Sequence, residues 1–456
     1  MTVKDCVLAF CPPFLRPWWD RLESSPFGYR LARGAFWSLA GSVTSHVLLL
    51  LSSIIVARML GKSSYGQLAM VQSTVSMFGI FAGFGLGVTA TKFVAELRST
   101  NPERAGRIVG LSGIVAAVTG SVMSVTLFVF APWLAEHTFS APELSDMLRI
   151  ACPLLFLSAL NGGQTGTLLG FEAFRTIARV SIMVGLASFP LLIAGAYFGG
   201  LRGTVTALVL NLCINWALNN RALRKEARRH AVKVSFQHWR SELQLLWRFS
   251  LPVVLSSLMI GPTNWICGTM LVRQADGFGE MGIYNAANQW KMAIFFVPGL
   301  LSQVFLPLLS SGSAAEPGSR QSAKIIGIGI LLNGGTALAV ALPVALLGHQ
   351  IMRAYGPGFA DGVGVLRALA FTSALMAVND TLRQAFTSKS KVWTALMFNG
   401  LWAVSLLLLA GLLIQHGYGA QGLASATLVT YMLHIGWQYL YYLFYIRRRG
   451  GAPAAL

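Results

Sequence analysis

Apolar runs of about 20 residues recur along the whole chain, the length that a helix needs to cross the hydrocarbon core of a membrane. Short polar segments rich in Gly and Pro separate most of them, for example GKSSYG, STNPER and GSAAEPGSR. The alternation of polar and apolar residues that is typical of a membrane β-barrel is absent. The pattern predicts an all-α, polytopic membrane protein with spans at 35–58, 67–91, 107–131, 148–170, 177–199, 204–222, 249–272, 283–309, 324–347, 363–385, 392–414 and 422–446.

The twelve predicted spans form two halves that repeat weakly. Four landmarks recur in the same order: Arg58 to Ser73 with Arg273 to Gln289, RIVG (107–110) with KIIG (324–327), LRIA (148–151) with LRAL (366–369), and GTVTALV (203–209) with GLASATLV (422–429). With six helices in each half, both halves begin on the same side of the membrane. Such a parallel repeat is typical of transporters, whose substrate path lies between the two lobes.

We therefore expect two six-helix lobes joined by a basic linker. The expected boundaries are a cytoplasmic N-terminal segment at 1–33, an N-lobe at 34–222, a linker at 223–248, a C-lobe at 249–446 and a cytoplasmic tail at 447–456. The first segment lacks the continuous apolar core and the small-residue cleavage site of a signal peptide. The linker is basic enough to rest on anionic lipid headgroups.

Composition and charge add an orientation to this picture. The chain is 55% hydrophobic and 11% charged, whereas soluble proteins carry about a quarter charged residues. Most of the Lys and Arg residues behind the net charge of +19 fall in segments on one side. The positive-inside rule makes this side cytoplasmic and both termini cytoplasmic. Because the charge is spread over separate segments, it is a topology signal, and no nucleic-acid partner is expected.

The predicted span at 283–309 carries polar residues where lipid would be expected. At about 100° per residue, Tyr284, Asn285, Asn288, Gln289 and Lys291 fall within an arc of about 160°. This arc should face a cavity or the partner lobe, because a charged residue at mid-membrane is costly and usually functional. A lysine here suits a mobile anion such as a diphosphate or an acidic sugar. The alternative is that Lys291 reaches the outer surface along its long stem.

Each of the other candidate functional residues also has a purely structural alternative. In the internal repeat, Gln72 is equivalent to the amides of the span at 283–309 and is a further candidate for the cavity lining. Arg58 and Arg273 are equivalent to one another. They are either cations of the cavity or anchors at the membrane interface. Asp380 and Arg383 are spaced i, i+3 and can pair on one helix face, as a cytoplasmic gate or as a structural ion pair. His46 and His434 lie within spans, where a histidine relays protons or forms hydrogen bonds between helices.

Motifs for catalysis and for cofactor binding are absent from the sequence. There is no HExxH, no GxSxG and no Walker A motif, and the five cysteines form no CxxC pair or Cys/His cluster. We expect neither an enzyme nor a metal site, and no cofactor. We expect a monomer in contact with membrane lipids.

Two segments carry a resemblance to a known family. The stretch 34–97, with ARMLGKSSYG after the first span and GFGLGVTATKFVAE at the end of the second, resembles the polysaccharide-transport, or Wzx-type O-antigen, flippases. These belong to the multidrug/oligosaccharidyl-lipid/polysaccharide (MOP) exporter superfamily. The span at 283–309 matches through Tyr284, Ala287 and its two prolines, Pro298 and Pro307. With the linker and the helix count, the likeness covers roughly 30–446.

The resemblance implies a two-lobed transporter that alternates access. It implies a cargo of undecaprenyl-diphosphate-linked oligosaccharide, moved to the outer leaflet of a bacterial inner membrane, with a glycan polymerase and a chain-length regulator as further partners. The alternative is a multidrug or cation antiporter of the same superfamily. That branch typically places an acidic residue within the membrane, in each lobe or in the first span, but the first, second, seventh and eighth spans hold none in their cores.

Overall fold

The computed structural model describes residues 26–235, 250, 254, 259–309, 320–388 and 392–450. Every regular element in these residues is a helix, which confirms the predicted all-α fold. The elements are α3 (Pro26–Gly83), α4 (Leu86–Leu97), α5 (Pro102–Trp133), η2 (Leu134–Thr138), α6 (Leu144–Gly170), α7 (Phe174–Arg229), α10 (Gly261–Val272), α11 (Gly277–Leu309), α12 (Arg320–Leu346), α13 (Gly348–Tyr355), η6 (Pro357–Gly362), α14 (Val363–Ser388), α15 (Val392–Gln415) and α16 (Gly419–Gly450).

Two of these helices fold back on themselves at a glycine. Gly61 in α3 has φ 76° and Gly200 in α7 has φ 53°, a region that favours glycine. The hydroxyls of Ser53 and Tyr65 lie 2.6 Å apart, whereas twelve residues of straight helix span about 18 Å. Residues 26–60 and 62–83 are therefore two antiparallel arms of α3.

Seven helical stretches in the described residues are long and apolar enough to cross a membrane. Two of them, Val43–Gly83 and Phe174–Arg229, have 41 and 56 residues, whereas about 20 residues suffice for one crossing. Because each folds back at its glycine, each supplies two crossings. Every span predicted from the sequence overlaps one of the helices; part of the span at 249–272 lies outside the described residues.

Two of the differences between the structure and the predicted spans have a clear local cause. The span at 67–91 is broken between α3 and α4, where Phe84 and Gly85 have positive φ values of 42° and 63°. In addition, α7 continues to Arg229, beyond the predicted end at residue 222. The buried carboxylate of Glu226 holds this extension, because it accepts a hydrogen bond of 2.8 Å from Thr176. Residues 236–248 of the predicted linker lie outside the described residues.

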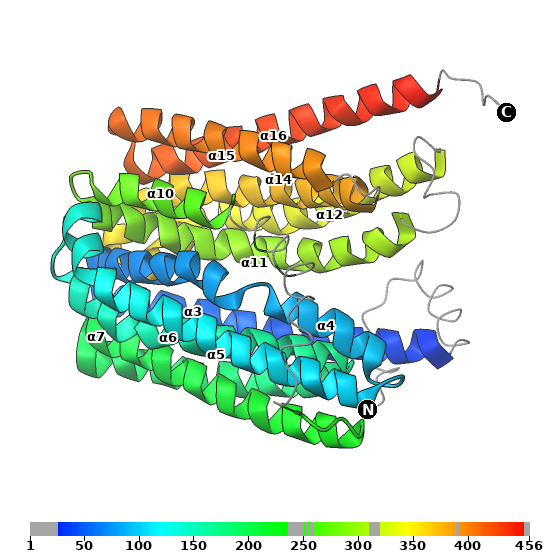
Figure 1. Cartoon of the computed structure of the whole chain (residues 1–456). Helices are drawn as coiled ribbons and strands as arrows, with labels where there is room; N and C mark the ends of the chain where they lie inside the picture. Colours follow the sequence, from blue (N-terminus) through cyan, green and yellow to red (C-terminus); the bar gives the residue numbers. More distant parts are fainter. Residues whose placement is uncertain are drawn as a thin grey trace.

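The helices form two groups that lie side by side (Figure 1). We call α3 to α7 the N-lobe and α10 to α16 the C-lobe. The second arm of α3 packs against α11 across the interface, and one cluster of buried apolar residues extends through both lobes. α3 begins and α16 ends at the same end of the molecule, at the right of Figure 1.

The contact between α3 and α11 depends on a pair of glycines. A Cβ atom on Gly66 would lie 2.8 Å from the backbone nitrogen of Gly282, and a Cβ atom on Gly282 would lie 3.3 Å from the nitrogen of Gly66. These two glycines correspond to one another in the internal repeat. Without side chains they let the backbones approach closely, as small residues do between membrane helices.

Candidate functional site

A cavity of about 340 Å³ lies between the lobes, on one side of the Gly66–Gly282 contact. The second arm of α3 forms one wall, and α10, α11 and α16 form the other. The lining is rich in polar side chains that come from both lobes: Gln72, Ser73, Ser76, Asn264, Tyr284, Asn285, Asn288 and Lys291. The cavity therefore offers hydrogen-bond donors and acceptors within an otherwise apolar interface.

Lys291 is the cation of this cavity. Its side chain lines the cavity, and the residue is only 7% exposed. Within the described residues, Lys291 makes no hydrogen bond or ion pair. A buried ammonium group without a counterion is unfavourable unless a ligand compensates the charge. This position favours a role inside the cavity over a side chain that reaches the outer surface.

The other polar residues of the predicted arc divide between two cavities. Asn285 and Asn288 line the same cavity as Lys291, whereas Gln289 lines a smaller one of about 100 Å³ with Ser52, Ser53 and Tyr65 of α3. Gln72 lines both cavities. A helix of 3.6 residues per turn presents neighbouring residues to different directions, which explains the division.

The end of the interface beyond the two glycines is closed by polar contacts between the lobes. Lys62 of α3 forms an ion pair of 2.5 Å with Asp276, just before α11. The guanidinium group of Arg273 donates hydrogen bonds to the backbone oxygens of Thr138 (2.9 Å) and His137. Tyr65 also meets Phe359 edge to face. These contacts link the C-lobe to the N-lobe at the end that the charge pattern assigns to the outside.

Arg58 and Arg273 do not occupy matching places in the cavity. Neither residue lines it: Arg273 joins the lobes at the closed end, and Arg58 is exposed at the surface. Sequence reasoning overlooked Lys62 and Asp276, which meet across the interface. The signal that could have found them is the repeat itself, because their separation of 214 residues is close to that of Gly66 and Gly282.

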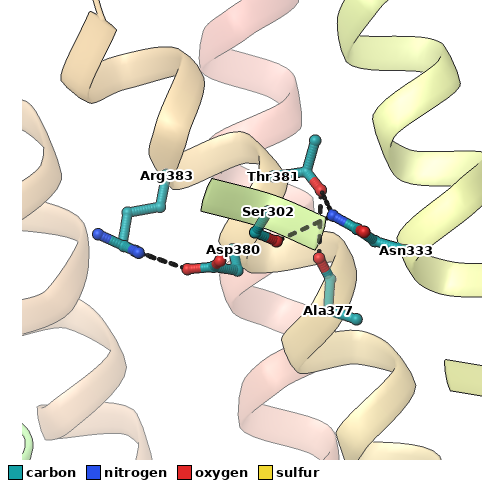
Figure 2. A network of polar contacts seen from close by, with 6 residues as sticks. All are labelled: Ser302, Asn333, Ala377, Asp380, Thr381 and Arg383. Carbon is teal, nitrogen blue, oxygen red and sulfur yellow. Dashed lines mark hydrogen bonds and ion pairs between the residues drawn. The ribbon is translucent and has the colours of Figure 1, made fainter. Parts of the chain in front are cut away.

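Asp380, Arg383 and His434 share a separate cavity of about 150 Å³ inside the C-lobe. The carboxylate of Asp380 accepts hydrogen bonds from Arg383 Nε (2.9 Å) and from a terminal guanidinium nitrogen (2.6 Å), so the two residues pair along α14 (Figure 2). The side chain of Asp380 is 14% exposed and that of Arg383 is 49% exposed. This ion pair lies within one helix and does not itself join the two lobes.

A second polar group lies beside this ion pair. Asn333 Nδ2 donates hydrogen bonds to Ser302 Oγ (2.9 Å) and Thr381 Oγ1 (2.8 Å), and all three residues are fully buried (Figure 2). The bonds connect α12 to α11 and α14. Buried hydrogen bonds of this kind hold membrane helices together, so we assign this group to the packing of the C-lobe.

The two histidines have different surroundings. His434 is buried, and its Nδ1 accepts a hydrogen bond of 3.2 Å from Trp437 Nε1 while its Nε2 lies 2.7 Å from the amide of Gln438. Both partners lie on α16, so the hydrogen bonds are local to one helix. His46 packs against Phe296 of the C-lobe, with ring centroids 4.2 Å apart.

The described residues contain no group of three or more His, Cys, Asp or Glu side chains that could hold a metal ion. The chemistry available in the cavity between the lobes is therefore that of one cation and several neutral hydrogen-bonding groups. Such a set suits a large ligand that carries an anionic group and many hydroxyls. It is a binding surface rather than a catalytic constellation.

Comparison with known proteins identifies the class of this chain. Residues 31–313 match the family of polysaccharide biosynthesis proteins, and the chain belongs to this family. Its fold is that of the MOP superfamily: it superposes on an inward-facing multidrug resistance MATE transporter of that superfamily (TM-score 0.74, 16% identity, 92% of this chain and 100% of the other). It also superposes on the lipid II flippase MurJ in an inward closed conformation (TM-score 0.69, 13% identity, 90% and 87%).

Particular relatives are export proteins and flippases. The EPS I polysaccharide export inner membrane protein EpsE of Ralstonia nicotianae is 27% identical over 405 residues, 88% of this chain and 91% of the relative. The lipid III flippase of Escherichia coli K12 is 23% identical over 293 residues, 61% and 67% of the two chains. The predicted family and fold class are confirmed, and the relatives agree with the expectation that the chain is not an enzyme.

Proposed function

We propose that this chain is a flippase that carries a lipid-linked oligosaccharide across a bacterial inner membrane. The finer part of the proposal is that the carrier lipid is undecaprenyl diphosphate and that both termini are cytoplasmic. The family of the chain and the export and flippase relatives support transport of a glycan precursor in general. The carrier and the orientation are supported by the cavity and by the charge pattern of this sequence.

The observation that carries the proposal is the buried, unpaired Lys291 in the cavity between the lobes. A diphosphate is the anion that such a cation would compensate, and amide and hydroxyl side chains on both walls can exchange hydrogen bonds with sugar hydroxyls. Because neutral groups supply the rest of the lining, the site can accept different sugars while it still requires an anion.

Transport requires the two lobes to move relative to one another. A cavity of about 340 Å³ is at the lower end of the range of about 300–1,000 Å³ for drug-sized ligands, and a lipid-linked oligosaccharide is larger. The contacts of Lys62, Asp276 and Arg273 close one end of the interface. In the proposed cycle these contacts break when the cargo is released to the outer leaflet and form again afterwards.

A multidrug or cation antiporter is less well supported. No Asp or Glu is among the residues that line the cavity in the described part of the chain. A cationic drug would meet Lys291 without a compensating carboxylate, and like charges repel. The likeness to MATE transporters is at 16% identity and concerns the fold alone.

The test is complementation of a strain that lacks this gene. We expect Lys291→Ala to abolish surface glycan, with lipid-linked oligosaccharide accumulating on the cytoplasmic face, and Lys291→Arg to retain part of the export because it keeps the charge. Asp380→Asn serves as a comparison that changes the charge in the separate C-lobe cavity. Normal export by Lys291→Ala at equal protein level would contradict the proposal.

Two further measurements test the carrier lipid and the orientation of the termini. Mass spectrometry of the lipid that accumulates would identify its carrier, and a carrier other than undecaprenyl diphosphate would correct that part of the proposal. Labelling of a cysteine introduced at the end of α16 from the two sides of the membrane would test the orientation. Reaction from the periplasmic side alone would contradict cytoplasmic termini.

A further inference from the structure

A third cavity lies on the flank of the N-lobe, away from the interface between the lobes. It has a volume of about 250 Å³ and is lined by α5, α6 and α7, with Val234 at one end. α5 and α7 both pack against α6 but make almost no contact with one another. α6 therefore forms the floor of a groove, which we call the N-lobe groove, and α5 and α7 form its two walls.

The floor of the N-lobe groove is one face of α6. Leu160, Gly163, Gln164 and Thr167 have the spacing i, i+3, i+4, i+7 that places residues on one side of a helix. The walls are largely apolar, with Val109 and Leu223 among them, so most of the groove suits a hydrocarbon chain. No residue of the C-lobe lines it in the described part of the chain.

Two polar side chains that line the groove are without a partner in the described residues. Arg224 lines it, is exposed, and makes no ion pair or hydrogen bond within the described residues. The Oε1 atom of Gln164 is buried and accepts no hydrogen bond from the described residues. A ligand with an anionic group would compensate the charge of Arg224.

The position of Arg224 along α7 places its side chain at a membrane surface. Twenty-four residues separate Arg224 from the turn at Gly200, which corresponds to about 36 Å of helix. The hydrocarbon core is about 30 Å thick. Arg224 therefore lies at headgroup level on the side opposite Gly200, and the apolar part of the groove extends from there into the adjacent leaflet.

We propose that the N-lobe groove binds an anionic phospholipid, with its phosphate at Arg224 and part of one acyl chain against α6. Basic pockets between helices at the cytoplasmic side are known to hold anionic headgroups. The proposal concerns a site distinct from the cavity of Lys291 and does not depend on the glycan. Its leaflet is the cytoplasmic one in the orientation proposed above.

The test uses the purified full-length protein in detergent. Dioleoyl phosphatidylglycerol and dioleoyl phosphatidylethanolamine, which share their acyl chains, are titrated while bound lipid is counted by native mass spectrometry and the Tm is recorded. We expect wild-type protein to prefer phosphatidylglycerol. Arg224→Gln should bind it about fivefold more weakly, the ratio expected for one cation at a membrane surface.

A second variant fills the groove without disturbing the fold. A Cβ atom on Gly113, which lines the groove, would meet nothing within 4 Å, so Gly113→Leu places its side chain in the space of the acyl chain. We expect this variant to fold and to lose the specific binding. Arg221→Gln and Gly411→Leu are the matched controls, since Arg221 is an exposed neighbour outside the groove and Gly411 is equally unobstructed.

The outcomes separate the possible occupants. Equal binding of the two phospholipids by wild-type protein, or unchanged phosphatidylglycerol binding in both groove variants, would overturn the proposal. Displacement of phosphatidylglycerol from the groove by undecaprenyl phosphate at equal concentration would overturn it in favour of a site for the cargo's carrier. Because no glycan is present in the assay, the result is independent of whether Lys291→Ala abolishes export.

Discussion

The second arm of α3 and the first half of α11 occupy equivalent places in the two halves of the chain. Both contribute a glycine to the contact between the lobes, Gly66 and Gly282, and both line the cavity with an amide at equivalent positions, Gln72 and Asn288. They differ three residues further along. Lys291 lines the cavity, whereas its equivalent, Val75, packs against the apolar core and does not line it.

This difference indicates how the two halves have divided their roles. The features that the halves share are those that the interface needs, a close backbone contact and a polar lining. The charge that would hold an anionic cargo comes from the C-lobe alone. In a duplicated scaffold, an asymmetric cargo does not need the same side chains on both walls.

The largest effect is expected from moving the charge to the other lobe. In a Lys291→Val, Val75→Lys double variant the net charge is unchanged, but residue 75 faces the apolar core. We expect export to be absent, as in Lys291→Val alone. The measurement is surface glycan at matched protein level. Recovery of export in the double variant would show that either wall can carry the charge and would contradict the proposed asymmetry.

The second largest effect is expected from Gly66 and Gly282, the glycine contact to which both helices contribute. Gly66→Leu would place a side chain against the backbone of α11, and overpacking of this kind costs about 3 kcal/mol at the upper end of the usual range. We expect a lower Tm and loss of export, and the same for Gly282→Leu. Gly335→Leu is the control, because a Cβ atom there meets nothing within 4 Å. Equal stability of Gly66→Leu and the control would rule out the close contact.

A smaller effect is expected from the ion pair at the closed end. The side chains of Lys62 and Asp276 are 37% and 54% exposed, and exposed pairs contribute about 1 kcal/mol or less. Lys62→Glu should therefore open this end of the interface about threefold more often, and Asp276→Lys added to it should restore closure. The measurement is the rate at which a membrane-impermeant maleimide labels Ser73→Cys from outside, in a background without the native cysteines.

The control for this experiment is a pair within one lobe. Arg202 and Asp146 form an ion pair of 2.8 Å at a similar surface, but both belong to the N-lobe. Arg202→Glu should leave the labelling rate of Ser73→Cys unchanged. If it accelerated labelling as much as Lys62→Glu, surface charge and not closure of the lobes would be responsible.

The smallest effects are expected from the equivalent amides. Gln72→Leu and Asn288→Leu each remove one hydrogen-bonding group from the cavity, and a typical hydrogen bond contributes about 1 kcal/mol. At the lower end of the usual range, about 0.5 kcal/mol, the loss of one such bond lowers the export rate about twofold, which we expect for each variant. Thr126→Val is the control, since Thr126 does not line the cavity and its hydroxyl donates to its own helix at Val122 O (2.8 Å). A wild-type rate in both amide variants would remove the polar lining from the proposed mechanism.

Much of the fold could be predicted from the sequence because the membrane imposes one length and one period on every span. The helices, their approximate limits and the polar arc of 284–291 follow from hydropathy and from about 3.6 residues per turn. The break at Phe84–Gly85 and the extension of α7 to Arg229 could not be predicted from hydropathy or from the helical period. They depend on a local positive φ and on the burial of Glu226 against Thr176.

The sequence by itself determined that the chain crosses a membrane many times, that its halves repeat and that one unusual lysine lies within a span. Only the tertiary structure decided which surface each residue faces. It separated Gln289 from Lys291, made Arg273 a link between the lobes and left Arg58 at the surface. The physical reason is that hydropathy records how much of a helix is buried, whereas contacts between residues some 200 positions apart depend on how the two lobes dock.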